Sequence, residues 1–164
     1  MFTTDHNWLI KQRTSQFFAA QMLTQEWAEP GDGEHRLFRA GSDIKDSQGH
    51  ILVTAYAVLR PDGQWSLMVI NKDYDNPHPV TVTFHDSDTG ASSSFTGPVE
   101  RITFGKEQYR WHSAMRDGYA DPDGPGDRST LPDGTGSFVL PAASLTVLRG
   151  RISNSMPAKL SQPR

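Results

Sequence analysis

The chain has 164 residues, no cysteine and a net charge of −3, with a pI near 6.0. A single domain of this length can bury enough apolar surface to fold without disulfides or a structural metal, and thiolate chemistry is excluded. The slightly acidic balance gives no electrostatic footprint for nucleic acid, and no apolar run reaches the about 20 residues that span a bilayer. We therefore expect no nucleic-acid partner, no membrane partner and no cofactor; the first residues lack the apolar core of a signal peptide, and the localisation stays open.

Residues 14–28 are the clearest helix candidate. Thr14 or Ser15 can cap the start, and Glu29-Pro30-Gly31 supplies the pre-proline restriction and the glycine that end a helix. The apolar residues recur at helical spacing, namely Phe18, Ala19, Ala20, Met22, Leu23 and Trp27. Because this stripe is wide, we expect the helix to be substantially buried.

The segment from Ile51 to Asp73 contains two apolar runs joined by Pro61-Asp62-Gly63. Proline presets φ and glycine accepts positive φ, so the three residues predict a turn and the two runs a β-hairpin. Both faces of each run are largely apolar, as in strands that are covered on both sides. We therefore expect this hairpin in the middle of the β-structure, with something packed on each face.

Further strands are predicted at turn spacing along the rest of the chain. Val80, Val82 and Phe84 alternate with polar residues, which indicates one dry face and one wet face. The other strand candidates are residues 36–44, 95–104, 137–140 and 145–152. Residues 86–94 are expected to form a loop, and residues 116–136 a long surface loop rich in Gly, Pro and Asp. The pattern predicts a mainly β fold, an antiparallel β-sandwich with one N-terminal α-helix packed against it.

Carboxylates and histidines form no recognisable catalytic or zinc motif. No pair of glutamates stands in the context that sugar hydrolysis by two carboxylates requires, so we interpret them as surface charge. These residues are Glu26, Glu29, Glu34, Glu100 and Glu107. His78, His85 and His112 lack the spacing of a zinc site and are interpreted as structural or surface histidines.

Three aspartates, Asp121, Asp123 and Asp127, are the weak candidates for a metal site. Their carboxylates could hold a hard cation, but Pro125 and Pro132 occupy the fifth and twelfth positions, where an EF-hand loop needs oxygen ligands. We favour an acidic turn, and a non-EF calcium site stays open as the alternative.

The aromatic cluster Tyr109, Trp111 and Tyr119 is the candidate sugar-binding site. The C–H faces of sugar rings pack on the π faces of exposed tryptophan and tyrosine, whose quadrupole is negative there. The alternative is that Tyr109 and Trp111, two residues apart on one strand, plug the edge of the sandwich or meet the helix.

Several segments taken together resemble the C-terminal region of clan A glycoside hydrolases. They are FFAAQMLTQEWAEPGDGEHRLFRAGSD, VTAYAVLRPDGQWSLMVINKD, FTGPVERITFGKEQYRWH, GYADPDGPGDRST and LPAASLTVLRG, in this order. The nearest likeness is to the β-xylosidase and α-L-arabinofuranosidase branches, families thirty-nine and fifty-one. The resemblance implies that residues 1–30 carry the last helix of a catalytic (β/α)8 barrel and that residues 31–152 form the accessory sandwich. The composition of residues 153–164 predicts a flexible tail. Some relatives add a sandwich strand from before the barrel.

The chain departs from this family where the chemistry lies. The family's acid/base glutamate follows an asparagine, and no Asn-Glu pair occurs here. Barrel active sites are built on loops after barrel strands, which are missing, so the resemblance assigns no catalytic residue. With the barrel absent, we expect an exposed apolar association patch at Phe17, Phe18, Met22 and Trp27, or a rearrangement that covers it.

Three functions follow as hypotheses. The first is a non-catalytic accessory sandwich with a structural role, whose partner is a separately encoded barrel or a second copy of the chain. The second is a free-standing carbohydrate-binding module for a polysaccharide. The third is a glycosidase that acts on xylo- or arabino-saccharides.

Overall fold

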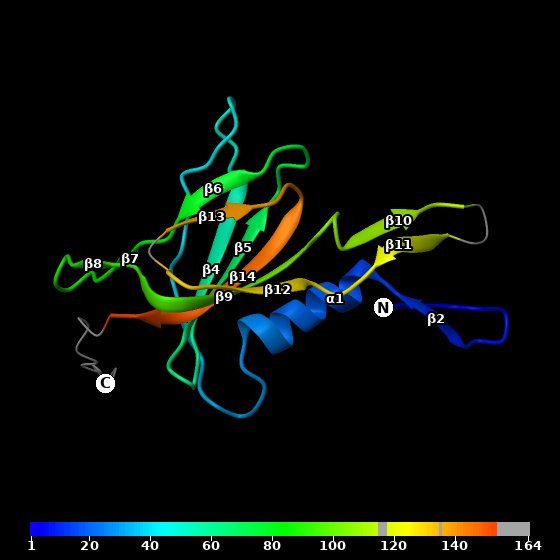
Figure 1. Cartoon of the computed structure of the whole chain (residues 1–164), viewed down its shortest axis with the longest axis horizontal. Coiled ribbons are helices and arrows are strands. Elements are labelled where there is room, and N and C mark those ends of the chain that lie inside the picture. The colour runs from blue at the N-terminus through cyan, green and yellow to red at the C-terminus, as the bar shows by residue number, and fades with distance from the viewer. Residues whose placement is uncertain (115–117, 135, 154–164) are drawn as a thin grey trace.

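The structure is a computed structural model that describes residues 1–114, 118–134 and 136–153. Apart from Ser153, the predicted tail lies outside the described residues. A six-stranded antiparallel sheet dominates the fold, in the spatial order β12-β9-β14-β5-β4-β3 (Figure 1). Its strands are β3 (Arg36–Phe38), β4 (Val53–Leu59), β5 (Trp65–Asn71), β9 (Phe95–Gly105), β12 (Asp127–Leu131) and β14 (Ser144–Ile152).

The predicted hairpin is confirmed as β4 and β5, at the centre of the sheet. The two strands pair from Val53↔Asn71 to Leu59↔Trp65. In the turn, the Gly63 N–H donates to the Arg60 carbonyl at 2.9 Å, and Gly63 has a φ of 75°. That positive φ is the reason the turn needs glycine.

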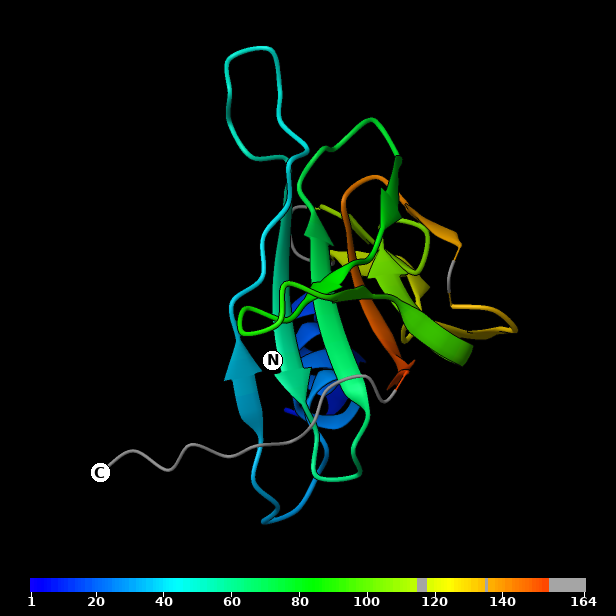
Figure 2. The same cartoon turned by 90° about the vertical axis from the view of Figure 1, so that its left-hand side faces the viewer.

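A smaller second layer covers one face of this sheet. It consists of two short ladders, β6 (His78–Thr81) with β13 (Ser137–Leu140), and β7 (Phe84–His85) with β8 (Ser92–Ser93). Phe84 of this layer packs on Trp65 and Phe95, with ring centroids 5.0 and 5.1 Å apart. The larger core lies between the two layers, and Figure 2 shows the β7–β8 ladder in front of the sheet, with the helix behind it.

The other face carries the helix and a second core. The helix starts as α1 (Ser15–Gln21) and continues as a π-helix, η1 (Met22–Trp27), so the predicted helix is confirmed. Phe18 and Met22 pack against residues of the central strands, Ile102, Phe104 and Val147. Strands β9 and β14 therefore contribute buried residues to both cores.

Two hairpins project from one end of the molecule, past the start of α1 (Figure 1). They are β1 (Phe2–Thr4) with β2 (Ile10–Arg13), and β10 (Tyr109–His112) with β11 (Tyr119–Asp123). We call these four strands the arm. The expectation of one long surface loop over residues 116–136 is wrong, because this segment supplies β11 to the arm and β12 to the edge of the main sheet. Backbone pairing with β10 and β9 outweighs the turn-rich composition there.

Candidate functional site

The predicted association patch on the helix is largely closed within the chain. Phe18 and Met22 are each only 3% exposed, because the sheet covers them. Phe17 stacks with Phe2 of the arm at 5.5 Å, and the Trp27 indole N–H donates to the Tyr56 carbonyl at 3.3 Å. Phe18 and Met22 are therefore not part of an exposed patch, and Phe17 and Trp27 are half-buried.

Ion pairs hold the end of the helix against the sheet. Glu26 meets Arg128 at 2.6 Å and Arg149 at 3.7 Å, and Glu100 pairs with the same two arginines. Arg60 and Arg149 also donate to the Glu26 carbonyl, each at 3.2 Å, which places positive charge at the helix C-terminus where the dipole favours it. Burial, and then the neighbouring Arg60, lowers the pKa of Arg149. Glu26 and Glu100 therefore serve as partners of arginines.

Two of the three aspartates of the metal hypothesis have separate protein partners. Asp123 accepts a hydrogen bond from the Gln12 amide at 3.2 Å, and Asp127 accepts one from Gln108 at 2.6 Å. Asp121 and Asp123 lie in β11, where an acidic turn was expected. In the described part of the chain, no group of three or more His, Cys, Asp or Glu side chains is arranged to hold a metal ion.

No described helix is long and apolar enough to cross a membrane.

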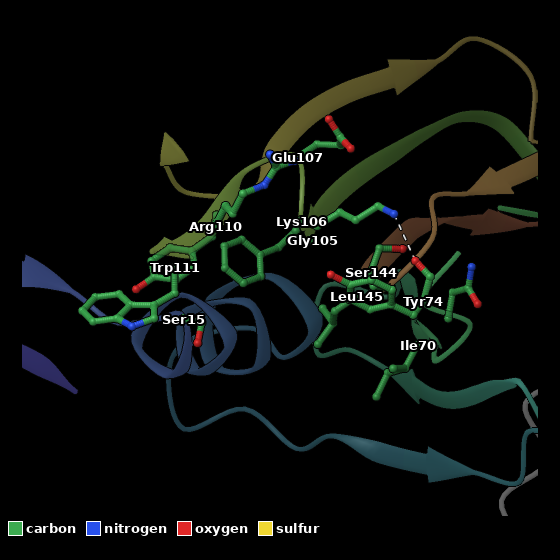
Figure 3. A pocket seen from close by; sticks show the side chains of 14 residues that line it. Ser15, Ile70, Tyr74, Gly105, Lys106, Glu107, Arg110, Trp111, Ser144 and Leu145 are labelled. Carbon is green, nitrogen blue, oxygen red and sulfur yellow. Dashed lines mark hydrogen bonds between the residues drawn. The ribbon is translucent and has the colours of Figure 1, made fainter. Parts of the chain in front are cut away.

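An open groove lies where the arm joins the main sheet (Figure 3). It encloses about 770 Å³ and takes its walls from the start of α1, the end of β9, β10, and the turns before β14 and after β5. Trp111 stands at one end near Ser15, and Tyr74 stands at the other end near Ser144. We call this the aromatic groove.

Both terminal rings of the aromatic groove are exposed but held in place. Tyr74 is 69% exposed, and Lys106 donates to its carbonyl at 3.0 Å with the ammonium 5.2 Å from the ring centroid. Trp111 is 45% exposed, and its ring lies so close to Gly118 that a Cβ there would come within 2.4 Å of it. Ring faces that are fixed in advance lose little freedom when a ligand stacks on them.

The predicted sugar-binding residues separate into two groups. Tyr109 and Trp111 line the aromatic groove, and burial, followed by the charge of Asp123, raises the pKa of the Tyr109 hydroxyl. Tyr119 lies outside it and stacks on His112 at 5.0 Å with an interplanar angle of 17°. Sequence reasoning missed Tyr74, because an aromatic residue in a polar turn 35 positions before Tyr109 gives no signal that the two share a surface.

A second cavity, of about 920 Å³, opens between the two layers of the sandwich. Its floor is formed by alternate residues of the central hairpin, namely Val53, Ala55, Ala57, Trp65, Leu67 and Val69. Residues 38–44 form one rim, and residues 79–85 form the other. We call this cavity the interlayer slot.

Comparison with known proteins gives distant likenesses only. No protein-family profile and no curated protein matches the chain. Among solved structures, the chain is similar to part of CelM2, described as a bifunctional glucanase-xylanase protein from a metagenome library (TM-score 0.35, 25% identity, 62% of this chain). It is also similar to part of the GH51 arabinofuranosidase from Xanthomonas axonopodis pv. citri (TM-score 0.40, 16% identity, 71% of this chain). The chain spans 16% and 21% of these two proteins.

A protein of unknown function, DUF1255, from Acinetobacter sp. ADP1 is similar at a TM-score of 0.39 and 12% identity, over 71% of this chain and 93% of that protein. TM-scores at this level establish no family for the chain.

Proposed function

We propose that this chain is a non-catalytic accessory β-sandwich domain of a glycoside hydrolase, and that it associates with a partner segment that fills the interlayer slot. The observation that carries the proposal is the slot itself. A cavity of about 920 Å³ remains between the two layers, over apolar floor residues of the main sheet that are, apart from Ala55, at most 9% exposed. A partner segment inserted there would gain apolar contacts with the floor and the rims.

The shape of the interlayer slot suits an extended peptide. Its floor along β4 runs from Val53 to Ala57, four residue steps, or about 13 Å at the usual rise of a strand. Among the described residues, β6 forms a ladder only with β13, so its other edge keeps unpaired backbone groups next to the slot. An added strand would gain hydrogen bonds from this edge and apolar contacts from the floor.

The distribution of carboxylates supports a role without catalysis. Glycoside hydrolysis by the usual mechanism requires two carboxylates on opposite sides of the scissile bond. Within the described part of the chain, the aromatic groove has one carboxylate in its lining, Glu107, and the interlayer slot has one, Asp43. The glycoside hydrolase context rests on the resemblance of the sequence segments, in which some relatives add a strand to the sandwich from before the barrel.

Light scattering over a range of concentrations tests the association. The chain is measured alone and after mixing with the barrel of a xylosidase or arabinofuranosidase that lacks its own sandwich. We expect a complex in one of the two samples, and we expect Ala55→Arg to abolish it because the long side chain fills the interlayer slot. Tyr56→Arg is the matched control, since Tyr56 is the next residue on β4, is 48% exposed and does not line the slot.

A strictly monomeric chain in both samples would refute the association, and so would a complex that Ala55→Arg leaves unchanged. Hydrolysis of 4-nitrophenyl xyloside or arabinofuranoside by the homogeneous protein would refute the non-catalytic role.

A further inference from the structure

The aromatic groove has the features of a ligand site that is separate from the interlayer slot. Its two exposed rings come from segments far apart in sequence, the turn after β5 and strand β10, yet both line one groove (Figure 3). Most binding pockets combine apolar or aromatic walls with a few polar groups that fix the orientation of the ligand. The aromatic groove has both kinds of lining residue.

Some polar side chains of the groove already form hydrogen bonds within the fold, and others do not. Asn71 and Ser144 donate to the Pro141 carbonyl, at 2.9 and 2.6 Å, and so are engaged within the fold. Glu107 and Arg110 are exposed, and in the described part of the chain neither side chain has a hydrogen bond or an ion pair. These two, with the ammonium of Lys106, leave a carboxylate acceptor and two cationic donors along the wall.

The floor between the rings is made of small residues. A Cβ on Gly105 would approach the Ala143 carbonyl oxygen to 2.8 Å, so the backbones of these two residues lie against each other. Ala143 has a φ of 48°, in the left-handed region that non-glycine residues rarely occupy, and its N–H donates to the Asp73 carbonyl at 2.7 Å. Strained backbone of this kind is often found at ligand sites.

We propose that the aromatic groove binds an oligosaccharide. Two sugar rings of one chain stack on Trp111 and Tyr74, with their C–H faces against the π faces. Glu107 accepts hydrogen bonds from sugar hydroxyls, and Lys106 and Arg110 donate to them. A purely apolar ligand would leave Glu107 and Arg110 without partners, and a highly charged anion would face the Glu107 carboxylate.

Isothermal titration with xylohexaose, arabinohexaose and cellohexaose tests the proposal. We expect at least one of them to bind, and we expect Trp111→Ala and Tyr74→Ala each to weaken binding by about tenfold or more, which corresponds to about 1.4 kcal/mol. Trp8→Ala is the matched control, because Trp8 is 85% exposed and does not line the groove. Its affinity should equal that of the wild-type chain.

A second measurement uses the indole N–H signals in a 1H–15N spectrum, since the chain has four tryptophans. The sugar should shift the signal that disappears in Trp111→Ala and leave the one that disappears in Trp8→Ala in place. Absence of binding by all three sugars, or equal binding by wild type and both groove variants, would overturn the proposal. Neither result bears on the association, because Ala55 lies in the interlayer slot and not in the groove.

Discussion

The side chain of Gln12 on β2 forms a two-point hydrogen bond with the backbone of Ala120 on β11. Its amide nitrogen donates to the Ala120 carbonyl at 3.1 Å, and its amide oxygen accepts from the Ala120 N–H at 3.1 Å. The side chain thus takes the place of a neighbouring strand and joins the two hairpins of the arm. Two residues 108 positions apart in the sequence are joined at this point.

Gln12→Met tests this connection, because the substitution keeps the size of the side chain and removes both hydrogen bonds to Ala120 together with the one to Asp123. A buried backbone group left without a partner costs about 1–3 kcal/mol, so hydrogen exchange of the amides in Phe2–Thr4 should accelerate by a corresponding factor. Lys11→Met, at the exposed neighbouring position, should leave their exchange unchanged. Equal exchange in both variants would show that the hairpin is held by other contacts.

Arg149 and Arg128 contact the same two glutamates but differ in burial. The Arg149 side chain is 12% exposed and that of Arg128 is 47% exposed. We expect Arg149→Met to lower the free energy of unfolding by about 3 kcal/mol, because it removes the buried cation that pairs with Glu100 and Glu26 and donates to the Glu26 carbonyl. Arg128→Met should cost no more than about 1 kcal/mol. Urea denaturation measures both, and a larger loss from Arg128→Met would contradict this assignment.

Phe18 fixes the helix to the sheet through aromatic contacts. Its ring centroid lies 5.5 Å from that of Phe104 and 6.0 Å from that of Tyr109. Phe18→Ala should therefore lower the free energy of unfolding by about 3–5 kcal/mol. Leu23→Ala, on the exposed side of the same helix at 41% exposure, should change it by about 0.5 kcal/mol or less. Similar losses in the two variants, measured by thermal unfolding, would mean that the helix face is assigned wrongly.

The lowered pKa of Asp73 predicts that the folded chain loses stability in acid. Hydrogen bonds from the backbone N–H groups of Asp75 and Asn76, with smaller contributions from the Asn76 and His78 side chains, lower its pKa from 3.8 to about 2. A pKa that is lower in the folded chain means that the unfolded chain binds the proton more readily, so stability rises with pH across this window. The contribution is complete above about pH 4 and is lost as the pH falls through about 2.

Urea denaturation at a series of acidic pH values checks this sign. Asp73→Asn should reduce the stability difference between about pH 4 and about pH 2, and Asp75→Asn should retain it. An unchanged pH dependence in Asp73→Asn would show that other carboxylates account for it.

Local sequence patterns predicted which segments form helix and strand better than they predicted what packs against those segments. The alternation in Ile51–Asp73 and the Pro61-Asp62-Gly63 turn were sufficient for the central hairpin, because turn chemistry and strand period are properties of adjacent residues. The stripe on residues 14–28 gave the helix, but the stripe does not specify what covers it. Two sheet residues bury Phe18. They are Ile102 and Val147, which lie 84 and 129 positions further along the chain.

The candidate sites show the same division. Tyr109 and Trp111 are two residues apart in the sequence, so they were recognisable as an aromatic cluster, and both line the aromatic groove. Tyr74 and Ser144 reach it only because β5 and β14 pair in the register Ser144↔Asn71, which composition does not encode. Asp121 and Asp123 were expected in a turn because of the surrounding Gly and Pro, but strand pairing with β10 was not visible locally.

Strand β14 is the last element described, yet it lies in the interior of the main sheet, hydrogen-bonded to β5 on one side and to β9 on the other. While the chain is being synthesised, β4–β5 and β9–β12 can each pair locally, but they remain separate until residues 144–152 have left the ribosome. Folding of the main sheet is therefore expected to be completed only after residues 144–152 are available, and slowly, because its decisive contacts are long-range. A chain terminated before Ser144 would retain two unconnected ladders, β3–β4–β5 and β9–β12, whose open edges favour aggregation.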